Sequence, residues 1–215
     1  MKLSCFLTTL TGSLAVVALT GVLCTADPVG AAEPADSQRM QLPAGWTIAD
    51  IQTCIEAGTP GKMHEFLAKS VGRWTGTQTR WMYPAAEPVS SRCDRIVTSI
   101  YDGRYLKVEM HSEIPGIGPL HGFGLYGYDN VTKEFVSTWI DSWGTGIMNG
   151  TGKLDPDGKI LHWSYKYNCP LTKRPATIRE VQTVTGPNTR IMEWFTTDPK
   201  SGQEYQMLRV EFERD

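Results

Sequence analysis

Two patterns in the sequence resemble chemical motifs, and each lacks a part that its chemistry requires. Gly122, Gly124 and Gly127 have the spacing of a dinucleotide-binding loop, but they lie in an alternating run with no helix-period segment after it. Glycines in such a run are typical of a strand that a backbone, a large neighbour or a ligand approaches closely. His64 begins a zinc-protease HExxH motif, but Ala68 stands where the second histidine belongs. The sequence therefore predicts neither a nucleotide fold nor a zinc protease.

The segment around Asp141 is the most informative for a binding site. Strand alternation puts four of its side chains on one face: Phe135, Ser137, Trp139 and Asp141. A buried carboxylate without a partner is very costly, so Asp141 must pair with a base or lie exposed at the mouth of a pocket. Arg179 and Arg209 are the candidate bases. In the alternative interpretation, Asp141 caps the following turn and the arginines pair with glutamates on the outside.

The candidate pocket residues are aromatic or polar side chains on apolar strands. The set is Trp74, Trp139, Asp141, His162, Arg179 and Glu193. Aromatic walls with a few converging polar groups are the usual composition of a ligand pocket, and a plain core has a similar composition. The leading hypothesis is a barrel that binds a small apolar or amphipathic molecule.

Two other functions stay open at this point. An isomerase or hydrolase would use Asp141 or Glu193 as a general base, with His162 or Arg179 polarising a carbonyl group. An envelope interaction module would hold no small ligand and would carry a large exposed apolar patch. The sequence gives no catalytic residue, no ligand identity and no oligomeric state.

The cysteines and the charge narrow the classes of partner. Cys54, Cys93 and Cys169 have no CxxC spacing, so the sequence predicts no metal site. Cys93 and Cys169 are both expected near strand ends and are the pair to join if a disulfide forms. The formal net charge of −2 favours neither nucleic acid nor an anionic membrane surface as a partner.

Short strands are the elements that must position these residues. Beyond Gly72, β-branched and aromatic residues alternate with polar ones between turn-forming pairs such as Asp102-Gly103. The expected strands lie near 73–83, 91–101, 104–113, 120–128, 134–142, 145–153, 159–167, 176–185, 189–197 and 204–213. Their short links favour an antiparallel up-and-down meander, which removes its exposed edges by closing into a barrel. A β-sandwich is the alternative.

The part of the chain before the barrel divides into three segments. Residues 1–32 have an early lysine, an apolar run and small residues at the end, the layout of a cleaved signal peptide, with an uncleaved anchor as the alternative. We expect a flexible tether over 33–46 and one or two short helices over 47–72, packed on the barrel of residues 73–215. The protein is therefore expected to be exported, periplasmic or extracellular, without a membrane span after cleavage.

Several short motifs occur in a fixed order along the chain. They are Gly58-Thr59-Pro60 with His64, Gly72-Arg73-Trp74, Gly127-Tyr128-Asp129, Trp139-Ile140-Asp141-Ser142, Gly152 with Asp155, Gly158-Lys159 and Glu213-Arg214. In this order they resemble the bacterial domain-of-unknown-function 1579 family. The resemblance implies an exported protein with a lipocalin-like β-barrel. It supplies no catalytic residues, because the family has no settled activity.

A second resemblance bears on cofactors. The segment from Val71 to Gly76 is similar to the G-x-W-x-G opening of calycin barrels and of haem-binding nitrobindin-like barrels. The latter use a histidine near the C-terminus as the axial ligand, whereas His162 is the last histidine of this chain. The resemblance therefore does not extend to haem, and no cofactor is predicted.

Overall fold

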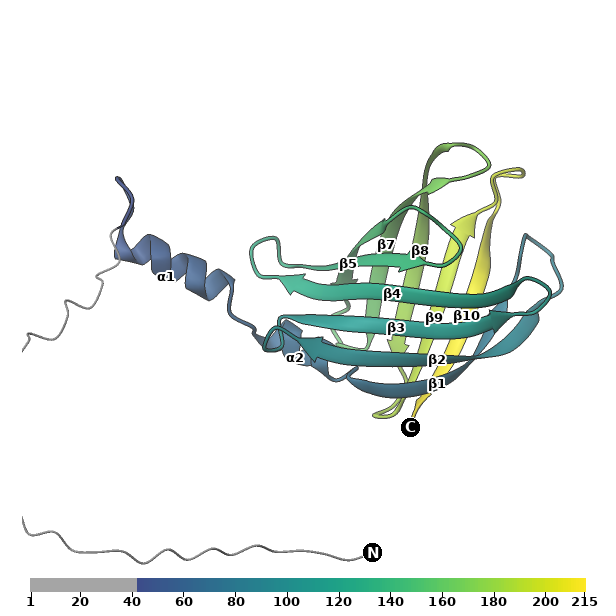
Figure 1. The fold of residues 1–215 in the computed structure, drawn as a ribbon, viewed down its shortest axis with the longest axis horizontal. Coiled ribbons are helices and arrows are strands. Elements are labelled where there is room, and N and C mark those ends of the chain that lie inside the picture. Colours follow the sequence, from purple (N-terminus) through teal and green to yellow (C-terminus); the bar gives the residue numbers. More distant parts are fainter. Residues whose placement is uncertain (1–41) are drawn as a thin grey trace, which may run out of the picture. The chain divides into compact units, whose positions relative to one another are not determined.

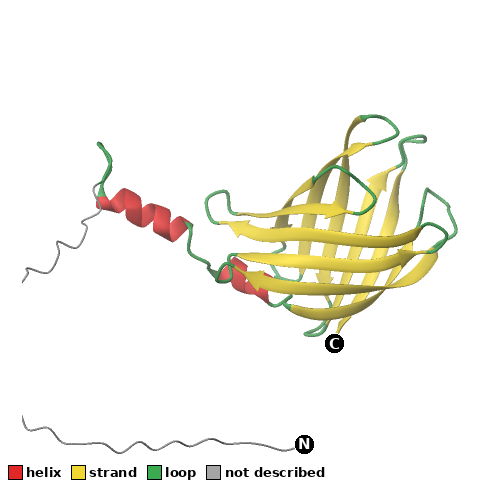
Figure 2. Ribbon diagram, viewed as in Figure 1, coloured by secondary structure: helices red, strands yellow, loops and turns green. Residues whose placement is uncertain are grey.

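A closed β-barrel is the main feature of the computed structural model, which describes residues 42–215 (Figure 1; Figure 2). Its ten strands are β1 (Gly72–Arg80), β2 (Val89–Ile100), β3 (Tyr105–Ile114), β4 (Gly118–Asp129), β5 (Glu134–Asp141), β6 (Met148–Leu154), β7 (Ile160–Cys169), β8 (Arg174–Val184), β9 (Thr189–Thr197) and β10 (Glu204–Arg214). Each strand pairs antiparallel with its sequence neighbours, and β1 pairs with β10 to close the sheet. The predicted up-and-down barrel is confirmed, and the alternative β-sandwich is excluded.

The expected signal peptide over residues 1–32 lies outside the described residues, as does most of the expected tether over 33–46. Both stay predictions.

Helix α1 (Ile48–Ala57) begins where its sequence signals place it. The Thr47 side chain accepts a hydrogen bond from the Asp50 backbone N–H at 3.2 Å, and the Asp50 carboxylate accepts one from the Thr47 N–H at 2.7 Å. None of its residues is buried. The expectation that the N-terminal helices pack on the barrel is therefore wrong for α1. Of the two helices, α2 supplies the apolar side chains that fill the barrel end. Within residues 42–215, neither helix is long and apolar enough to cross a membrane.

Helix α2 (Lys62–Ala68) closes one end of the barrel (Figure 2). Leu67 is 5% exposed and belongs to the main core cluster. The Phe66 ring packs edge-on against Phe135 on β5, with 5.9 Å between ring centroids. These contacts place the apolar face of α2 on the core, in agreement with the predicted helical spacing.

The segment that leads into α2 is attached to a hairpin of the barrel. The Gly61 backbone N–H donates to His64 Nδ1 at 3.1 Å, and the His64 ring packs edge-on against Tyr128. The Asn130 amide donates to the Thr59 carbonyl at 2.8 Å. His64 therefore has a structural role at the start of a helix, and no zinc motif is formed around it.

Trp74 fills the barrel end beneath α2. Its side chain is 2% exposed, and its Nε1–H donates to the Ser70 carbonyl at 2.8 Å. The guanidinium groups of Arg214 and Arg190 lie 4.2 Å and 5.2 Å from the centre of its ring. Arg214 also donates to the Lys69 carbonyl at 2.6 Å. We call this region, formed by α2, Trp74, Arg190 and Arg214, the closed end.

Candidate functional site

A cavity of 230 Å³ lies inside the barrel. Its wall includes Arg80, the last residue of β1, whereas α2 leads into the first residue of that strand. The cavity therefore occupies the half of the barrel away from α2, which we call the open half. Most of its wall is apolar or aromatic, with contributions from Met110, Tyr126, Ile178, Met192 and Trp194. This is the usual composition of a small-molecule pocket.

The loop between β5 and β6 frames the mouth of the cavity. Trp143, Met148 and Tyr167 line both the cavity and an adjoining surface hollow of 670 Å³. The Trp143 Nε1–H donates to the Pro119 carbonyl at 3.2 Å, which holds this loop against β4. The cavity and the surface hollow therefore meet beneath this loop.

The Trp139 ring lies along the cavity wall because β4 has glycines beneath it. A Cβ atom at Gly122 would overlap the Trp139 ring, and one at Gly124 would lie 3.0 Å from its Cε3 atom. The prediction of a strand approached closely by a large neighbour is therefore correct, and the neighbour is Trp139. The two glycines keep this ring against the sheet and leave the lumen open.

Asp141 lies at the mouth, where it also caps a turn. Its carboxylate accepts hydrogen bonds from the Trp139 Nε1–H at 3.1 Å and from the Trp143 backbone N–H at 2.9 Å. Asp141 lines the cavity as well. Both interpretations of this residue from the sequence therefore apply, because the same carboxylate faces the cavity and holds the mouth loop.

Arg80 and Arg95 bring two positive charges to the cavity wall. Among residues 42–215, neither side chain forms an ion pair or a hydrogen bond, and the Nε atom of each is buried without a partner. Burial lowers the pKa of Arg80, and the attraction of Asp141 acts in the opposite direction. The Arg95 guanidinium lies 5.5 Å from the centre of the Phe212 ring. Two guanidinium groups thus face an apolar space without a paired carboxylate.

A carboxyl group lies deeper in the same half of the barrel. Glu180 on β8 is fully buried, and it accepts hydrogen bonds from the Gln182 amide and the Trp194 indole. Burial raises its pKa to about 7, although the two hydrogen bonds and the charge of Arg95 act in the opposite direction. Glu180 is therefore partly protonated near neutral pH, and each of its carboxyl oxygens already accepts one hydrogen bond.

Only two of the six predicted pocket residues line this cavity, namely Trp139 and Asp141. Trp74 belongs to the closed end. His162 is exposed on the outer face of β7. The expectation that these residues share one interior pocket is therefore wrong for Trp74 and His162.

Arg179 and Glu193 also lie on the outer face. Arg179 pairs with Glu204 at 3.5 Å and stacks over Phe195, and Glu193 pairs with Arg209 at 2.7 Å. The expectation that Arg179 and Glu193 face the pocket is therefore wrong. The inner face of each strand is shifted by one residue from the expected one. The catalytic arrangement that combined Asp141 or Glu193 with His162 or Arg179 is not assembled.

The inner-face residues that the sequence prediction missed are Arg80, Arg95, Glu180 and Gln182. A signal for Glu180 was present, because it follows the buried Ile178 by two positions on the same strand.

Cys93 and Cys169 are free thiols on β2 and β7, so the suggested disulfide is not formed. Four strands separate β2 from β7 in either direction around the barrel. The two residues therefore lie on opposite walls, whereas the Cα atoms of a disulfide lie within about 7 Å. Burial raises the pKa of the Cys93 thiol to about 12. Within residues 42–215, no cluster of three or more histidine, cysteine or acidic side chains could hold a metal ion.

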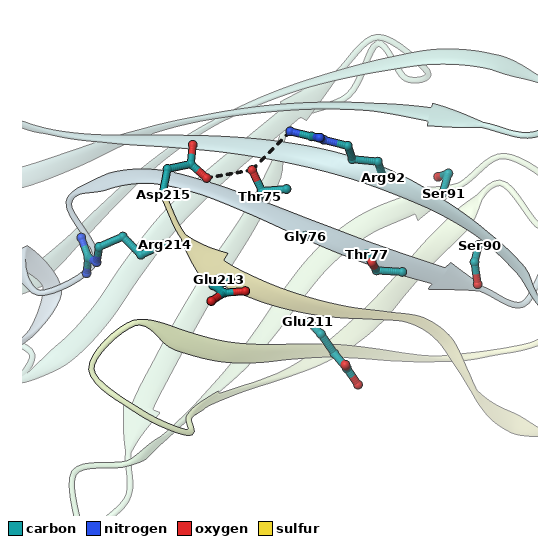
Figure 3. A pocket seen from close by; sticks show the side chains of 10 residues that line it. All are labelled: Thr75, Gly76, Thr77, Ser90, Ser91, Arg92, Glu211, Glu213, Arg214 and Asp215. Atoms are coloured by element: carbon teal, nitrogen blue, oxygen red, sulfur yellow. Dashed lines mark hydrogen bonds between the residues drawn. The ribbon is translucent and has the colours of Figure 1, made fainter.

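A second hollow, of 510 Å³, lies on the outer face over β1 (Figure 3). Two of its polar contacts are internal: the Thr75 hydroxyl donates to Asp215 at 2.8 Å and accepts a hydrogen bond from Arg92 at 3.4 Å. Arg92 also pairs with Asp94, beside the hollow, at 3.1 Å. This contrasts with the interior cavity, where the arginines have no such partners. The interior cavity is therefore the stronger candidate site.

The chain belongs to a family described as a protein of unknown function (DUF1579), whose model matches residues 59–214. No curated protein matches the chain. The predicted family membership is confirmed.

Two solved structures share the fold. The S-type phycobiliprotein lyase CPES from Guillardia theta superposes with a TM-score of 0.51 and 12% identity, over 75% of this chain and 96% of its own. The protein Rv2717c from M. tuberculosis superposes with a TM-score of 0.53 and 14% identity, over 73% of this chain and 99% of its own. At these identities the similarity is one of fold.

Proposed function

We propose that this protein binds a small amphipathic molecule in the cavity of the open half. The observation that carries the proposal is the cavity itself, because protein interiors are normally packed to crystal-like density. The barrel has 230 Å³ of open space beside Trp139, Met192 and Trp194. Such a space costs stability, so its presence favours a bound molecule.

The size of the cavity limits the ligand. The volume of 230 Å³ corresponds to about eight water molecules at liquid density. A single short alkyl chain or one small ring fits this volume. The mouth beneath the β5–β6 loop gives such a molecule access without opening the barrel.

The fold comparisons are compatible with this function and do not carry it. A barrel of similar shape occurs in CPES, a phycobiliprotein lyase. The proposal for this chain depends on its own cavity. An enzyme that uses the predicted catalytic groups is less favoured, because only Asp141 of that set faces the cavity.

We further propose that the protein is exported, on the basis of the signal-like residues 1–32. The intact mass of the protein purified from its host should correspond to cleavage after Ala31 or Ala32. A full-length mass in the cytoplasmic fraction would contradict export and would leave the cavity proposal unaffected.

Native mass spectrometry of that protein, followed by denaturing release, tests for a ligand. A stoichiometric small molecule is the expected result. In parallel, Met110→Trp should fill the cavity and abolish binding of 1-octanol, as measured by calorimetry. Glu109→Trp is the matched control, because the neighbouring side chain on β3 forms an ion pair with Lys107 and does not line the cavity. A folded wild-type protein that is purified without a ligand and binds no octanol would contradict the proposal.

A further inference from the structure

We propose that the polar end of the ligand is an anion, in the simplest case a carboxylate, held by Arg80 and Arg95. This inference rests on the proposed binding of a small molecule in the cavity. It assigns an anion site and a chemical class of ligand to the wall formed by β1, β2 and β3.

The unsatisfied polar atoms are concentrated on one wall of the barrel. Seven buried side-chain polar atoms of residues 42–215 have no hydrogen-bond partner. Four of them lie on the inner face of β1, β2 and β3: Gln78 Oε1, Arg80 Nε, Arg95 Nε and Ser112 Oγ. Of these residues, Arg80 and Arg95 line the cavity, whereas Gln78 and Ser112 do not. Buried polar atoms are normally paired, so the head group of the ligand is expected beside the two arginines.

Other arginines of the barrel have partners. On the outer face, Arg92, Arg179 and Arg209 each pair with a carboxylate. At the closed end, Arg190 and Arg214 donate to the Lys69 carbonyl. Arg80 and Arg95 alone face the cavity, and they do so unpaired. Both side chains are partly buried, and an unpaired charge in such a position costs stability, which an anionic ligand would restore.

The charge balance around these arginines is positive. Asp141 faces Arg80, and Glu180, whose raised pKa leaves it partly protonated near neutral pH, faces Arg95. Arg190 adds positive charge near Arg95, since Arg95 is one cause of the lowered Arg190 pKa, after burial. The wall therefore favours an anion and disfavours an amine.

The geometry also fits a carboxylate. A guanidinium group presents planar, parallel N–H donors that match a carboxylate better than a hydroxyl. The small cavity leaves little room for a bulky head group. A separate part of the wall, formed by β8 and β9 with Ile178, Met192 and Trp194, is suited to the apolar tail. The ligand thus lies with its head on β1 and β2 and its tail along β8 and β9.

Three probes with the same tail test the inference: octanoate, 1-octanol and octylamine, titrated into the wild-type protein by calorimetry. Octanoate should bind at least about tenfold more tightly than octanol, because charge-assisted hydrogen bonds are stronger than neutral ones. Octylamine should bind more weakly than either. Arg80→Met and Arg95→Met should each weaken octanoate about tenfold or more and leave octanol nearly unchanged.

Arg179→Met is the matched control, since this arginine lies on the outer face beside Glu204. It should alter none of the three affinities. Equal affinities of octanoate and octanol for the wild type would overturn the anion site and leave the cavity proposal standing. Failure of all three probes would instead overturn the proposed function. The wild-type comparison needs no variant, so the inference can be tested even if an arginine variant does not fold.

Discussion

Arginines occur at both ends of the barrel interior, in opposite situations. At the closed end, Arg190 and Arg214 lie beside the Trp74 ring and donate to a backbone carbonyl at the end of α2. In the open half, Arg80 and Arg95 reach into the cavity without a partner. The same side chain therefore stabilises the fold at one end, whereas at the other it is available to a ligand.

The aromatic residues differ between the two ends in the same way. Trp74 is 2% exposed and is enclosed by neighbours. Trp143 is 43% exposed and lies at the mouth. The closed end is thus packed like a core, and the open half is built around a space. Pieces of the family resemblance such as His64, Trp74 and Arg214 lie at the closed end, which explains why they indicate a fold better than a function.

The largest expected effect is at the closed end. Trp74→Ala should lower the free energy of unfolding by about 3–5 kcal/mol, because it removes a buried ring that packs against two guanidinium groups. Urea denaturation followed by circular dichroism measures the loss. Trp143→Ala at the mouth should cost less than about 1 kcal/mol. Equal losses at the two positions would contradict the distinction between a packed end and an open one.

The second effect concerns Glu180, whose burial raises its pKa from 4.5 to about 7. The folded protein then binds more protons than the unfolded chain between these values, so this group's contribution to stability is complete below about pH 4.5. It declines as the pH rises to about 7, by on the order of 3 kcal/mol. In Glu180→Gln this decline should be absent. The free energy of unfolding of the variant should therefore rise relative to that of the wild type as the pH rises. Urea denaturation at a series of pH values measures it, and two parallel curves would contradict the shifted pKa.

The sequence predicted the fold well because strand alternation and turn residues are local signals. The ten strands lie within a few residues of their expected positions, and pairs such as Asp102-Gly103 form the turns between them. Closure followed from the need to remove exposed edges. The sequence did not predict that α1 lies off the core, because apolar spacing alone does not say which of two helices fills the barrel end.

The candidate site was predicted only in part. Trp139 and Asp141 were found, because β5 has a clear apolar face. On β9 both faces carry apolar residues: Ile191 and Phe195 lie on the face of Glu193, and Met192 and Trp194 lie on the other. Hydrophobicity alone therefore cannot choose the inner face of this strand.

The arginines of the cavity wall were missed for a different reason. Arg80 and Arg95 are charged residues on the inner face, where apolar side chains are expected. The local pattern at such positions indicates an outward side chain. Only the three-dimensional arrangement shows that they share a cavity.

The third prediction compares two arginines directly. Arg214→Met should destabilise the protein by about 2 kcal/mol, because it removes hydrogen bonds to the Lys69 and Val71 carbonyls and a contact with Trp74. Arg95→Met should instead stabilise the ligand-free protein by about 1 kcal/mol, because it replaces an unpaired, partly buried charge with an apolar chain of similar length. Thermal unfolding shows whether each variant is less stable or more stable than the wild type. Destabilisation by Arg95→Met would show that this arginine already has a partner in the free protein.

An effect of similar size is expected on the wall of the cavity itself. Gly122→Ala should cost about 1–2 kcal/mol, since its Cβ would overlap the Trp139 ring and push that ring toward the lumen. The displaced ring should also reduce the affinity for octanoate, which calorimetry measures together with a urea titration. Gly146→Ala is the control, because no atom lies within 4 Å of a Cβ at that position in the mouth loop. If Gly122→Ala lost stability without losing affinity, the Trp139 ring would have moved away from the cavity, and the glycines of β4 would serve packing alone.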